Sequence, residues 1–430
     1  MSSIMPPAPD GKAIVIRGDA ANLHLPDETV DLIVTSPPYF GLRSYTDGGE
    51  HYAGQVGDEA TPTEYLDALI ACTAEWMRVL KPGGSIFVNL GDKYAGRSGG
   101  PQGATGERAS RSQAQTYADA RPALDWTVRD KSLVGLPWRY AIRCIDELGL
   151  ILRAEIVWAK PNGLPESVTD RVRRSHEQVF HFVKQPRYYS AVDSIREQHQ
   201  TPGVGGPRRL SGAAFGPAGR TETADGSRHT DGNPLGKLPG SVWSIPTSPL
   251  RVPESLGIDH FAAYPPELVR RIVLGWSPRE VCTACGEGRR PVSEKERMNG
   301  SRGVITGSAF EEGKHGTADG KRHEFATLVT LTGYACACPD TAAPAIPGVV
   351  LDPFGGTGTT ALVASVHDRV GISVDLSEDY CRLARWRTTD EKQRAKATGI
   401  KPKTPKRPAP EPLAEVIEIA DQLDMFGGVA

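Results

Sequence analysis

A strand, a glycine-rich turn, a helix and a second strand follow one another near the end of the chain, and this unit constrains the fold most. Apolar residues 349–351 predict a strand, residues 361–366 a helix, and residues 370–374 a second strand that ends at Asp375. Strands joined by such a helix run parallel, so the unit predicts an α/β protein with a doubly wound sheet. The glycines admit a ligand close to the backbone, and the acid suits ribose hydroxyls.

The residues of this turn limit the ligand. A phosphate-binding NTPase loop carries a lysine after its last glycine, whereas Thr359 follows Gly358 here. A dinucleotide fingerprint is harder to exclude, because Gly356 to Ala361 fit the pattern G-x-G-x-x-A. Asp352 at the head of the turn favours another ligand, since a carboxylate repels a pyrophosphate and attracts the ammonium of an amino acid. S-adenosylmethionine carries such an ammonium and a ribose, and it has no phosphate.

A second informative run, Thr35-Ser36-Pro37-Pro38-Tyr39, directly follows the strand-like residues 31–34. Prolines cannot continue a strand ladder, so we expect a stiff turn at the carboxyl end of that strand, where open α/β sheets bind ligands. The Ser36 hydroxyl and the Pro37 carbonyl can accept hydrogens from an amine on a flat heterocycle, and Tyr39 can stack on its ring. An ordinary proline-rich turn is the alternative interpretation.

Other strands are expected at residues 13–17, 31–35, 85–90, 152–158 and 179–184, with helices between them. The clearest helix spans residues 62–80, because Tyr65, Leu69, Trp76 and Leu80 share one stripe and Gly83-Gly84 marks its end. The chain has 430 residues, of which 39% are hydrophobic. That length suits one catalytic domain of roughly 250 residues with insertions.

These motifs together resemble the amino-methylating DNA methyltransferases, which transfer a methyl group from S-adenosylmethionine to N6 of adenine or N4 of cytosine. The order is the permuted β-type one, with S-P-P-Y near the amino terminus and D-P-F-x-G-x-G-T near the carboxyl terminus. Stretches of that family are also matched by residues 16–19, 79–84 with 86–90, 156–162, 175–177 with 180–184, and 260–265. The resemblance implies a Rossmann-like, S-adenosylmethionine-dependent methyltransferase fold.

The resemblance also implies site residues. The catalytic residues would be Ser36, Pro37, Pro38 and Tyr39. The cofactor-binding residues would be Asp19, Thr35, His260, Phe261, Pro265, Asp352, Pro353, Phe354, Gly356, Gly358, Thr359 and Asp375. The target base of double-stranded DNA is expected to flip into a pocket beside Tyr39.

The head of the catalytic motif bears on the target base. Serine there is commoner in the cytosine-N4 enzymes of the family, so N4 of cytosine is favoured and N6 of adenine is the alternative. A catalytically inactive DNA-binding protein of the same fold is a further alternative. No nuclease motif is visible, which favours a solitary modification enzyme or one with a separate restriction partner.

The formal net charge of −2 does not indicate nucleic-acid binding, so a DNA-facing surface must come from local clusters. Arg171, Arg173 and Arg174 form one such cluster. Residues 95–130 and 187–240 are rich in Gly, Ser, Arg and Pro and are interpreted as long loops or partly disordered insertions. In the second stretch, Arg208 and Arg209 could read guanines or contact phosphates.

The predicted division of the chain follows from these features. The catalytic-motif half is expected at 11–92, a flexible insertion at 93–131 and the substrate-side strands at 132–186. A target-recognition region is expected at 187–245, a helix that closes over the cofactor at 255–280 and a zinc insertion at 281–340. The cofactor-binding half is expected at 346–396 and a flexible tail at 397–430.

Four of the seven cysteines group as Cys282-x-x-Cys285 and Cys336-x-Cys338. Thiolates from two tight turns can meet on one tetrahedral zinc ion, so a structural zinc site is expected in this insertion. The alternative is four unrelated buried cysteines, the interpretation we give to Cys72, Cys144 and Cys381, which lie in apolar, helix-like contexts. A reducing compartment makes disulfides unfavourable.

The tail contains a peptide that resembles the Q-L-x-L-F peptides by which bacterial proteins bind the replication sliding clamp. Gln422 would hydrogen-bond at the rim of the groove, and Leu423, Met425 and Phe426 would fill it. A terminal helix that caps the protein's own core is the alternative. No apolar run approaches the ~20 residues that span a bilayer, and no signal peptide is visible. We therefore expect a cytoplasmic enzyme of a bacterium or a phage-infected cell.

Overall fold

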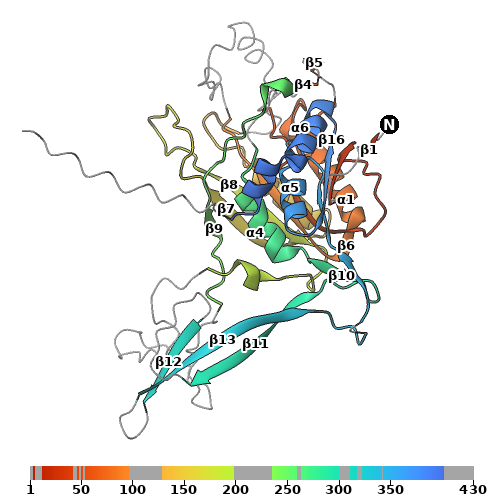
Figure 1. The fold of residues 1–430 in the computed structure, drawn as a ribbon. Helices are drawn as coiled ribbons and strands as arrows, with labels where there is room; N and C mark the ends of the chain where they lie inside the picture. The colour runs from red at the N-terminus through yellow and green to blue at the C-terminus, as the bar shows by residue number, and fades with distance from the viewer. Residues whose placement is uncertain are drawn as a thin grey trace, which may run out of the picture.

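The computed structural model describes residues 3–4, 12–41, 46–47, 50–51, 54–95, 128–197, 235–258, 263–299, 310–316, 322–340 and 342–400. Its centre is a nine-stranded sheet in the order β1-β2-β16-β15-β3-β6-β8-β7-β9 (Figure 1). These strands are β1 (Ser3–Ile4), β2 (Ala13–Arg17), β3 (Val30–Thr35), β6 (Leu80–Leu90), β7 (Ile151–Ala159), β8 (His176–Val183), β9 (Val242–Ser244), β15 (Val349–Asp352) and β16 (Val370–Asp375). The predicted α/β sheet is confirmed.

The directions of the strands bring distant parts of the chain to one edge of the sheet. Strands β2, β16, β15, β3 and β6 run parallel, β8 is antiparallel to β6, and β7 is antiparallel to β8. The carboxyl ends of the parallel strands and of β7 therefore lie beside the amino end of β8. We call this edge the carboxyl edge. The chain winds in opposite directions from β15 and from β3, and α/β sheets bind ligands at such a reversal.

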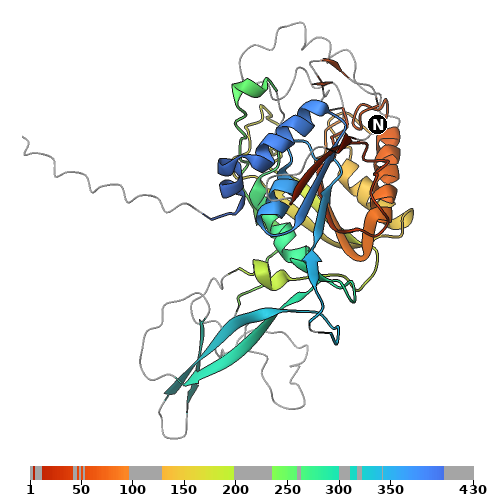
Figure 2. The ribbon, with the colours of Figure 1, turned by 45° about the vertical axis from the view of Figure 1, so that its right-hand side comes forward.

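Helices cover both faces of the sheet, which makes three layers (Figures 1 and 2). One face carries α4 (Pro266–Trp276), α5 (Thr359–Val366), α6 (Glu378–Thr389) and α7 (Glu391–Ala397), and the other carries α1 (Pro62–Val79) and α3 (Leu136–Asp146). Two large apolar clusters fill the spaces between the layers. The free Cys72, Cys144 and Cys381 lie buried in α1, α3 and α6, as predicted.

Helix α1 begins where its sequence dictates and ends slightly earlier than expected. Thr61 and Glu64 form a reciprocal capping box, and Pro62 occupies the first turn. The helix was expected to reach Leu80 and to stop at Gly83-Gly84, but Leu80 is extended and pairs with Val30 as the first residue of β6. Gly84 instead allows the close approach of β3, since a Cβ atom there would lie 2.9 Å from the Asp31 carbonyl oxygen.

A second structural unit projects from the end of the sheet opposite the carboxyl edge, where the parallel strands begin (Figure 1). It is an antiparallel sheet of β11 (Arg290–Asn299), β13 (Arg322–Ala335) and β12 (Phe310–Gly316). A short antiparallel pair, β10 (Glu280–Cys282) with β14 (Ala345–Pro347), joins it to the body. The sequence predicted an insertion over 281–340 but not these long strands.

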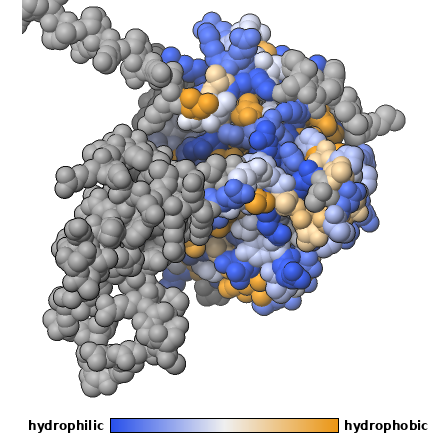
Figure 3. Space-filling model, turned by 60° about the horizontal axis from the view of Figure 1, so that its bottom comes forward, coloured by the Kyte–Doolittle hydropathy of each residue, from blue (hydrophilic) through white to orange (hydrophobic). Residues whose placement is uncertain are grey.

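The remaining described elements are short. They are β4 (Thr46–Asp47), β5 (Glu50–His51) and the 3-10 turns η1 (Val192–Ile195) and η2 (Glu254–Leu256). Strand β9, at the end of the predicted target-recognition range, pairs in parallel with β7 and so belongs to the central sheet. On the face shown in Figure 3, apolar residues form small separate patches among polar ones. Within the described parts of the chain, no helix has the length and apolar character to cross a membrane.

Candidate active site

The Ser36-Pro37-Pro38-Tyr39 run leaves β3 at the carboxyl edge, as its prolines predicted. Side chains of two other elements hold it. The Tyr65 hydroxyl of α1 donates to the Pro38 carbonyl at 2.9 Å, and the Asn89 amide of β6 donates to Ser36 Oγ at 3.2 Å. The turn is therefore rigid for reasons beyond its two prolines.

A polar cluster surrounds the Tyr39 hydroxyl. The hydroxyl donates to Glu177 Oε2 at 2.8 Å. The Asn89 Nδ2 atom lies 2.8 Å from the same carboxylate oxygen and 2.9 Å from the Tyr39 hydroxyl. Lys160 forms an ion pair with the other carboxylate oxygen. Tyr39, Asn89, Lys160 and Glu177 come from the ends of β3, β6, β7 and β8, so the strand order creates the cluster.

The protonation states in this cluster follow from its burial and charges. Burial raises the pKa of Tyr39 well above its usual value, and the Glu177 charge adds to this effect, so the phenol stays neutral. Burial alone would raise the pKa of Glu177, but the charge and hydrogen bond of Lys160 hold it below its usual value. Glu177 is therefore an ionised carboxylate that can only accept hydrogen bonds.

The glycine turn after β15 lies next to this loop, because Leu351 of β15 pairs with Ile33 of β3. Asp352 at its head is buried. Its Oδ2 atom accepts from the Tyr264 hydroxyl at 2.6 Å and from the Thr360 hydroxyl at 2.8 Å, and its Oδ1 atom accepts from the Phe354 backbone N–H at 3.2 Å. Burial raises the pKa of Asp352, and these hydrogen bonds oppose the rise.

A second acid stands at the end of the neighbouring strand. Asp375 accepts from the Gly356 N–H at 2.8 Å and from the Ser377 N–H at 2.9 Å. Burial raises its pKa to about 6. Asp19, which follows β2, lies beside the same strand end, since the Gly18 N–H donates to the Asp375 carbonyl at 3.0 Å. Three acids thus follow three adjacent strands.

Helix α6 packs against the glycine turn and holds it. Arg387 is only 3% exposed, and its Nη1 atom lies 2.6 Å from both the Thr357 and the Thr359 hydroxyl oxygens. Gly358 adopts a left-handed conformation with φ of 73°, and a Cβ atom there would lie 2.7 Å from the Ala384 Cβ atom. The turn therefore requires glycine at this position, both for its backbone and for its packing.

Comparison with known proteins places the chain in a family. A family model described as DNA methylase, for N6 and N4 methyltransferases, matches residues 30–281 and 345–385. The chain is a DNA amino-methyltransferase. It is 30% identical over 375 residues to the Type II methyltransferase M.SmaI of Serratia marcescens, which covers 87% of this chain and 89% of that protein. It is 33% identical over 264 residues to the Type II methyltransferase M.Cfr9I of Citrobacter freundii. That match covers 61% of this chain and 72% of that protein.

A solved structure, the cytosine-N4-specific PvuII DNA methyltransferase, aligns with 90% of this methyltransferase and 90% of its own chain. The two are 18% identical, and the TM-score is 0.47.

The methyltransferase brings most of the predicted site residues to one edge. Thr35 to Tyr39, Asp19, Asp352 to Thr359 and Asp375 follow neighbouring strands of the sheet. Pro265 directly precedes α4, as its N-cap. His260, Phe261, Arg208, Arg209 and the peptide residues Gln422, Leu423, Met425 and Phe426 lie outside the described residues.

Several residues of the site were not among those predicted from the sequence. Asn89, Lys160, Glu177 and Tyr264 lie in stretches that resembled the family, but nothing singled them out. Asp47 was also missed, and its carboxylate accepts from the Ser377 hydroxyl at 3.1 Å and the Asp379 N–H at 3.0 Å at the start of α6. A polar residue at a strand end was the one local signal for Asn89 and Lys160.

The predicted arginine cluster lies on the segment between β7 and β8. This segment is closed at its base by the Lys160 N–H, which donates to the Ser175 carbonyl at 2.7 Å. Arg171 pairs with Glu166 at 2.7 Å and lies over the Tyr94 ring, 3.9 Å from its centroid. Arg173 is exposed and Arg174 half-buried. The segment is therefore braced, and it begins at the polar cluster around Tyr39.

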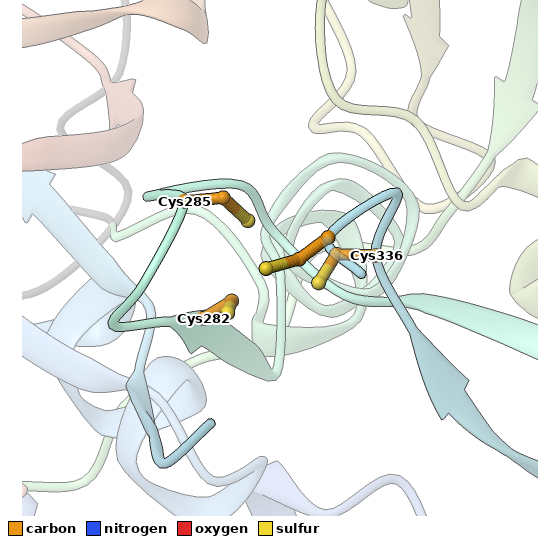
Figure 4. Close-up of side chains that lie close together, drawn as sticks. Cys282, Cys285 and Cys336 are labelled. Atoms are coloured by element: carbon orange, nitrogen blue, oxygen red, sulfur yellow. The ribbon is translucent and has the colours of Figure 1, made fainter. Parts of the chain in front are cut away.

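The four predicted metal ligands come together at the base of the projecting unit. The sulfur atoms of Cys282, Cys285, Cys336 and Cys338 all lie within 4.8 Å of one another. The labelled side chains in Figure 4 point into one common space. The backbone N–H groups of Cys285 and Ala284 lower the pKa of the Cys282 thiol to about 6.

Proposed function

We propose that this methyltransferase binds S-adenosylmethionine at the glycine turn 352–359 and methylates N4 of a cytosine that flips out of double-stranded DNA. The observation that carries the proposal is the pairing of β15 with β3, which sets the glycine turn beside the Ser36–Tyr39 run. A cofactor site and an amine-binding loop at one sheet reversal suit direct transfer between two bound ligands.

The residues of the glycine turn fit the cofactor. A Cβ atom at Gly356 would meet no atom closer than 3.9 Å, so the backbone there is open to a ligand. The Asp375 carboxylate next to it suits ribose hydroxyls, and Asp352 supplies negative charge toward an ammonium group. Asp19 and the segment that holds His260, Phe261 and Pro265 would complete the site. S-adenosylmethionine supplies an electrophilic methyl group on a sulfonium leaving group.

The residues of the Ser36–Tyr39 run would hold the base. Ser36 Oγ and the Pro37 carbonyl accept the amine hydrogens, which localises the nitrogen lone pair toward the methyl group. Tyr65 occupies the next carbonyl, that of Pro38, and so leaves this role to Pro37. The neutral Tyr39 ring stacks on the flipped base. Placement supplies most of the acceleration, and little acid–base chemistry is needed.

Replacing Asp352 or Tyr39 by alanine tests this assignment. Each variant should lose methyl transfer to DNA, measured with labelled S-adenosylmethionine, while circular dichroism shows an intact fold. Normal turnover by either variant would contradict the assignment. Binding of S-adenosylmethionine by the wild-type protein, measured by calorimetry, separates an enzyme from an inactive protein of the same fold.

The choice of N4 of cytosine rests on Ser36 at the head of the motif. Mass analysis of nucleosides from DNA methylated in vitro decides it, and we expect N4-methylcytosine. Recovery of N6-methyladenine alone would assign the alternative target. For DNA binding we propose Arg171, Arg173 and Arg174, with Arg208 and Arg209 in the proposed target-recognition range 187–245.

We also propose that Cys282, Cys285, Cys336 and Cys338 hold one structural zinc ion. Four sulfur atoms within 4.8 Å of one another match the ligand set of a tetrahedral site. A tight turn brings the first two thiols together. In it, Gly286 has a φ of 72°, and its N–H donates a hydrogen bond to the Cys282 carbonyl at 2.9 Å. The ion would clip the ends of β10 and β13 together, so its role is structural.

Metal analysis of purified protein should give about one zinc per chain. A Cys282→Ser variant should lose the ion and melt at lower temperature, because binding and folding are coupled. Cys144→Ser is the matched control, since Cys144 is a buried free thiol of α3 outside the cluster. Metal-free wild-type protein with the same stability as Cys282→Ser would refute the site.

A partner is proposed for the tail. The peptide Gln422 to Phe426 matches the clamp-binding pattern in sequence, and tethering there would raise the local concentration of enzyme at new DNA. A synthetic peptide of residues 411–430 should bind the host clamp weakly and lose binding after Phe426→Ala. Failure of the wild-type peptide to bind would remove this partner.

A further inference from the structure

A largely buried carboxylate beside the Ser36–Tyr39 run, that of Glu177, belongs to neither motif. The side chain of Glu177 is 16% exposed, and that of its ion-pair partner Lys160 is 20% exposed. Removing a carboxylate from water is costly, and a buried ion pair by itself contributes little stability. The position of Glu177 at the carboxyl edge, beside the Ser36–Tyr39 run, therefore favours a role beyond stability.

The contacts of Glu177 lead directly to the loop that would hold the base. Its Oε2 atom lies 2.8 Å from both the Tyr39 hydroxyl and the Asn89 Nδ2 atom. Since an ionised carboxylate only accepts hydrogen bonds, both groups must donate to it. This fixes the direction of the Tyr39 hydroxyl and turns the Asn89 amide nitrogen, rather than its oxygen, toward the cluster. The same nitrogen lies 3.2 Å from Ser36 Oγ.

The Tyr39 ring is also confined at its edge. A Cβ atom at Gly91 would lie only 2.6 Å from Tyr39 Cε2, so the ring packs directly against the backbone after β6. With its edge against Gly91 and its hydroxyl held by Glu177, the ring has one orientation. A ring held in this way presents its face to a ligand without losing rotational freedom on binding.

We propose that Glu177 is a positioning residue for methyl transfer, which fixes the Tyr39 ring in the orientation that receives the flipped base. Lys160 neutralises the carboxylate and keeps it in place. The inference rests on the proposed function of the Ser36–Tyr39 run. Glu177 would not touch the base or the cofactor; it acts through the Tyr39 hydroxyl, and through Asn89 to a smaller extent.

The test is a double-mutant cycle between Glu177→Gln and Tyr39→Phe, measured as kcat for methylation of a duplex and Kd for S-adenosylmethionine. Loss of one buried hydrogen bond to a charged group should lower kcat about tenfold in either single variant. Both changes weaken the same contact, since Glu177→Gln removes the charge of the acceptor and Tyr39→Phe removes the donor. The double variant should therefore fall by much less than the hundredfold of two independent losses. The Kd for S-adenosylmethionine should stay unchanged in all three.

Asp31→Asn is the matched control. Asp31 is another buried carboxylate, 8% exposed, and it pairs with Lys81 at 2.7 Å at the start of β3, the end opposite the catalytic loop. The Asp31→Asn variant should lose stability as Glu177→Gln does, and its kcat should stay that of the wild type. A similar fall in kcat for Asp31→Asn would show that destabilisation alone explains the effect and would overturn the proposal.

Additive effects in the cycle, or an unchanged kcat for Glu177→Gln, would also overturn the proposed role of Glu177. Neither result would affect the proposed function. That function fails by a different result, full turnover by Tyr39→Ala, so the two outcomes are distinguishable.

Discussion

The two halves of the site are built differently. In the glycine turn, the acids Asp352 and Asp375 accept from backbone N–H groups of the turn itself, at Phe354 and Gly356. In the Ser36–Tyr39 run, the contacts that hold Ser36 and Tyr39 come from side chains at distant positions, such as Asn89 and Glu177. The glycine turn is held mainly through its own backbone N–H groups, with Arg387 and Tyr264 added from outside the motif. The Ser36–Tyr39 run is held by side chains that the sheet brings to it.

This difference separates the effects expected from mutation. A backbone-built turn has no room for an added side chain at its close approaches, so one substitution there should strongly weaken ligand binding. A side-chain network loses one hydrogen bond at a time and should lose rate in graded steps. The following predictions use cofactor affinity and turnover as separate readouts of the two halves.

The largest effect is expected for Gly358→Ala. The new Cβ atom would meet Ala384 at 2.7 Å in a left-handed backbone conformation, a strain of roughly 3 kcal/mol. If the turn relaxes away from α6, affinity for S-adenosylmethionine should fall about 100-fold. Gly83→Ala is the control, because a Cβ atom there meets nothing within 4 Å. Wild-type affinity in Gly358→Ala would show that the turn is not rigid.

An intermediate effect is expected for Ser36→Ala in the other half. The change removes the proposed acceptor for the amine and one partner of Asn89, so kcat should fall about 30-fold. Affinity for S-adenosylmethionine should remain that of the wild type, which equilibrium binding can check. A parallel loss of cofactor affinity would erase the distinction between the halves.

The smallest effect concerns pH. Since burial raises the pKa of Asp375 to about 6, protonation below that pH removes its charge and its second acceptor site. Affinity for S-adenosylmethionine should therefore be about tenfold weaker at pH 5 than at pH 7. Calorimetry at both pH values checks this, and Asp375→Asn should bind weakly at both.

The stability of the free protein should respond in the opposite sense. A carboxyl group whose pKa is raised on folding binds its proton more tightly in the native state than in the unfolded chain. The contribution of Asp375 to the free energy of unfolding should therefore increase as the pH falls from about 6 toward its ordinary value near 4. Comparison of thermal melts of the wild type and Asp375→Asn over this range isolates the contribution.

The same difference explains what the sequence could predict. The strands expected at 13–17 and 370–375 have the observed bounds of β2 and β16, because apolar runs and turn residues are local signals. The D-P-F-x-G-x-G-T turn was recognisable for the same reason. Asp352 and the glycines lie within the motif itself, whereas Asp375 of β16 and Arg387 of α6 support the turn from outside it.

The polar cluster could not be predicted, because it depends on strand register. Glu177 reaches Lys160 through the antiparallel pairing of β8 with β7, in which Glu177 stands opposite Trp158. No feature of the local sequence sets that register. Strand β13 was missed for another reason. Its Phe325, Thr327, Val329 and Leu331 stand at alternate positions of the strand, but the apolar Ala326 and Leu328 lie between them, so the alternation of apolar and polar residues is incomplete.

The place of β15 and β16 in the sheet has a consequence for how the chain acquires its structure. These strands lie between β2 and β3, although more than 300 residues separate β3 from β15 along the chain. During synthesis, β2 and β3 emerge early and have no neighbour to bridge them until β16 is complete. The barrier should contain a large loop-closure entropy, which makes folding slow and late. Nascent chains that end before residue 349 should expose the unpaired edges of β2 and β3 and depend on chaperones until the last βαβ unit arrives.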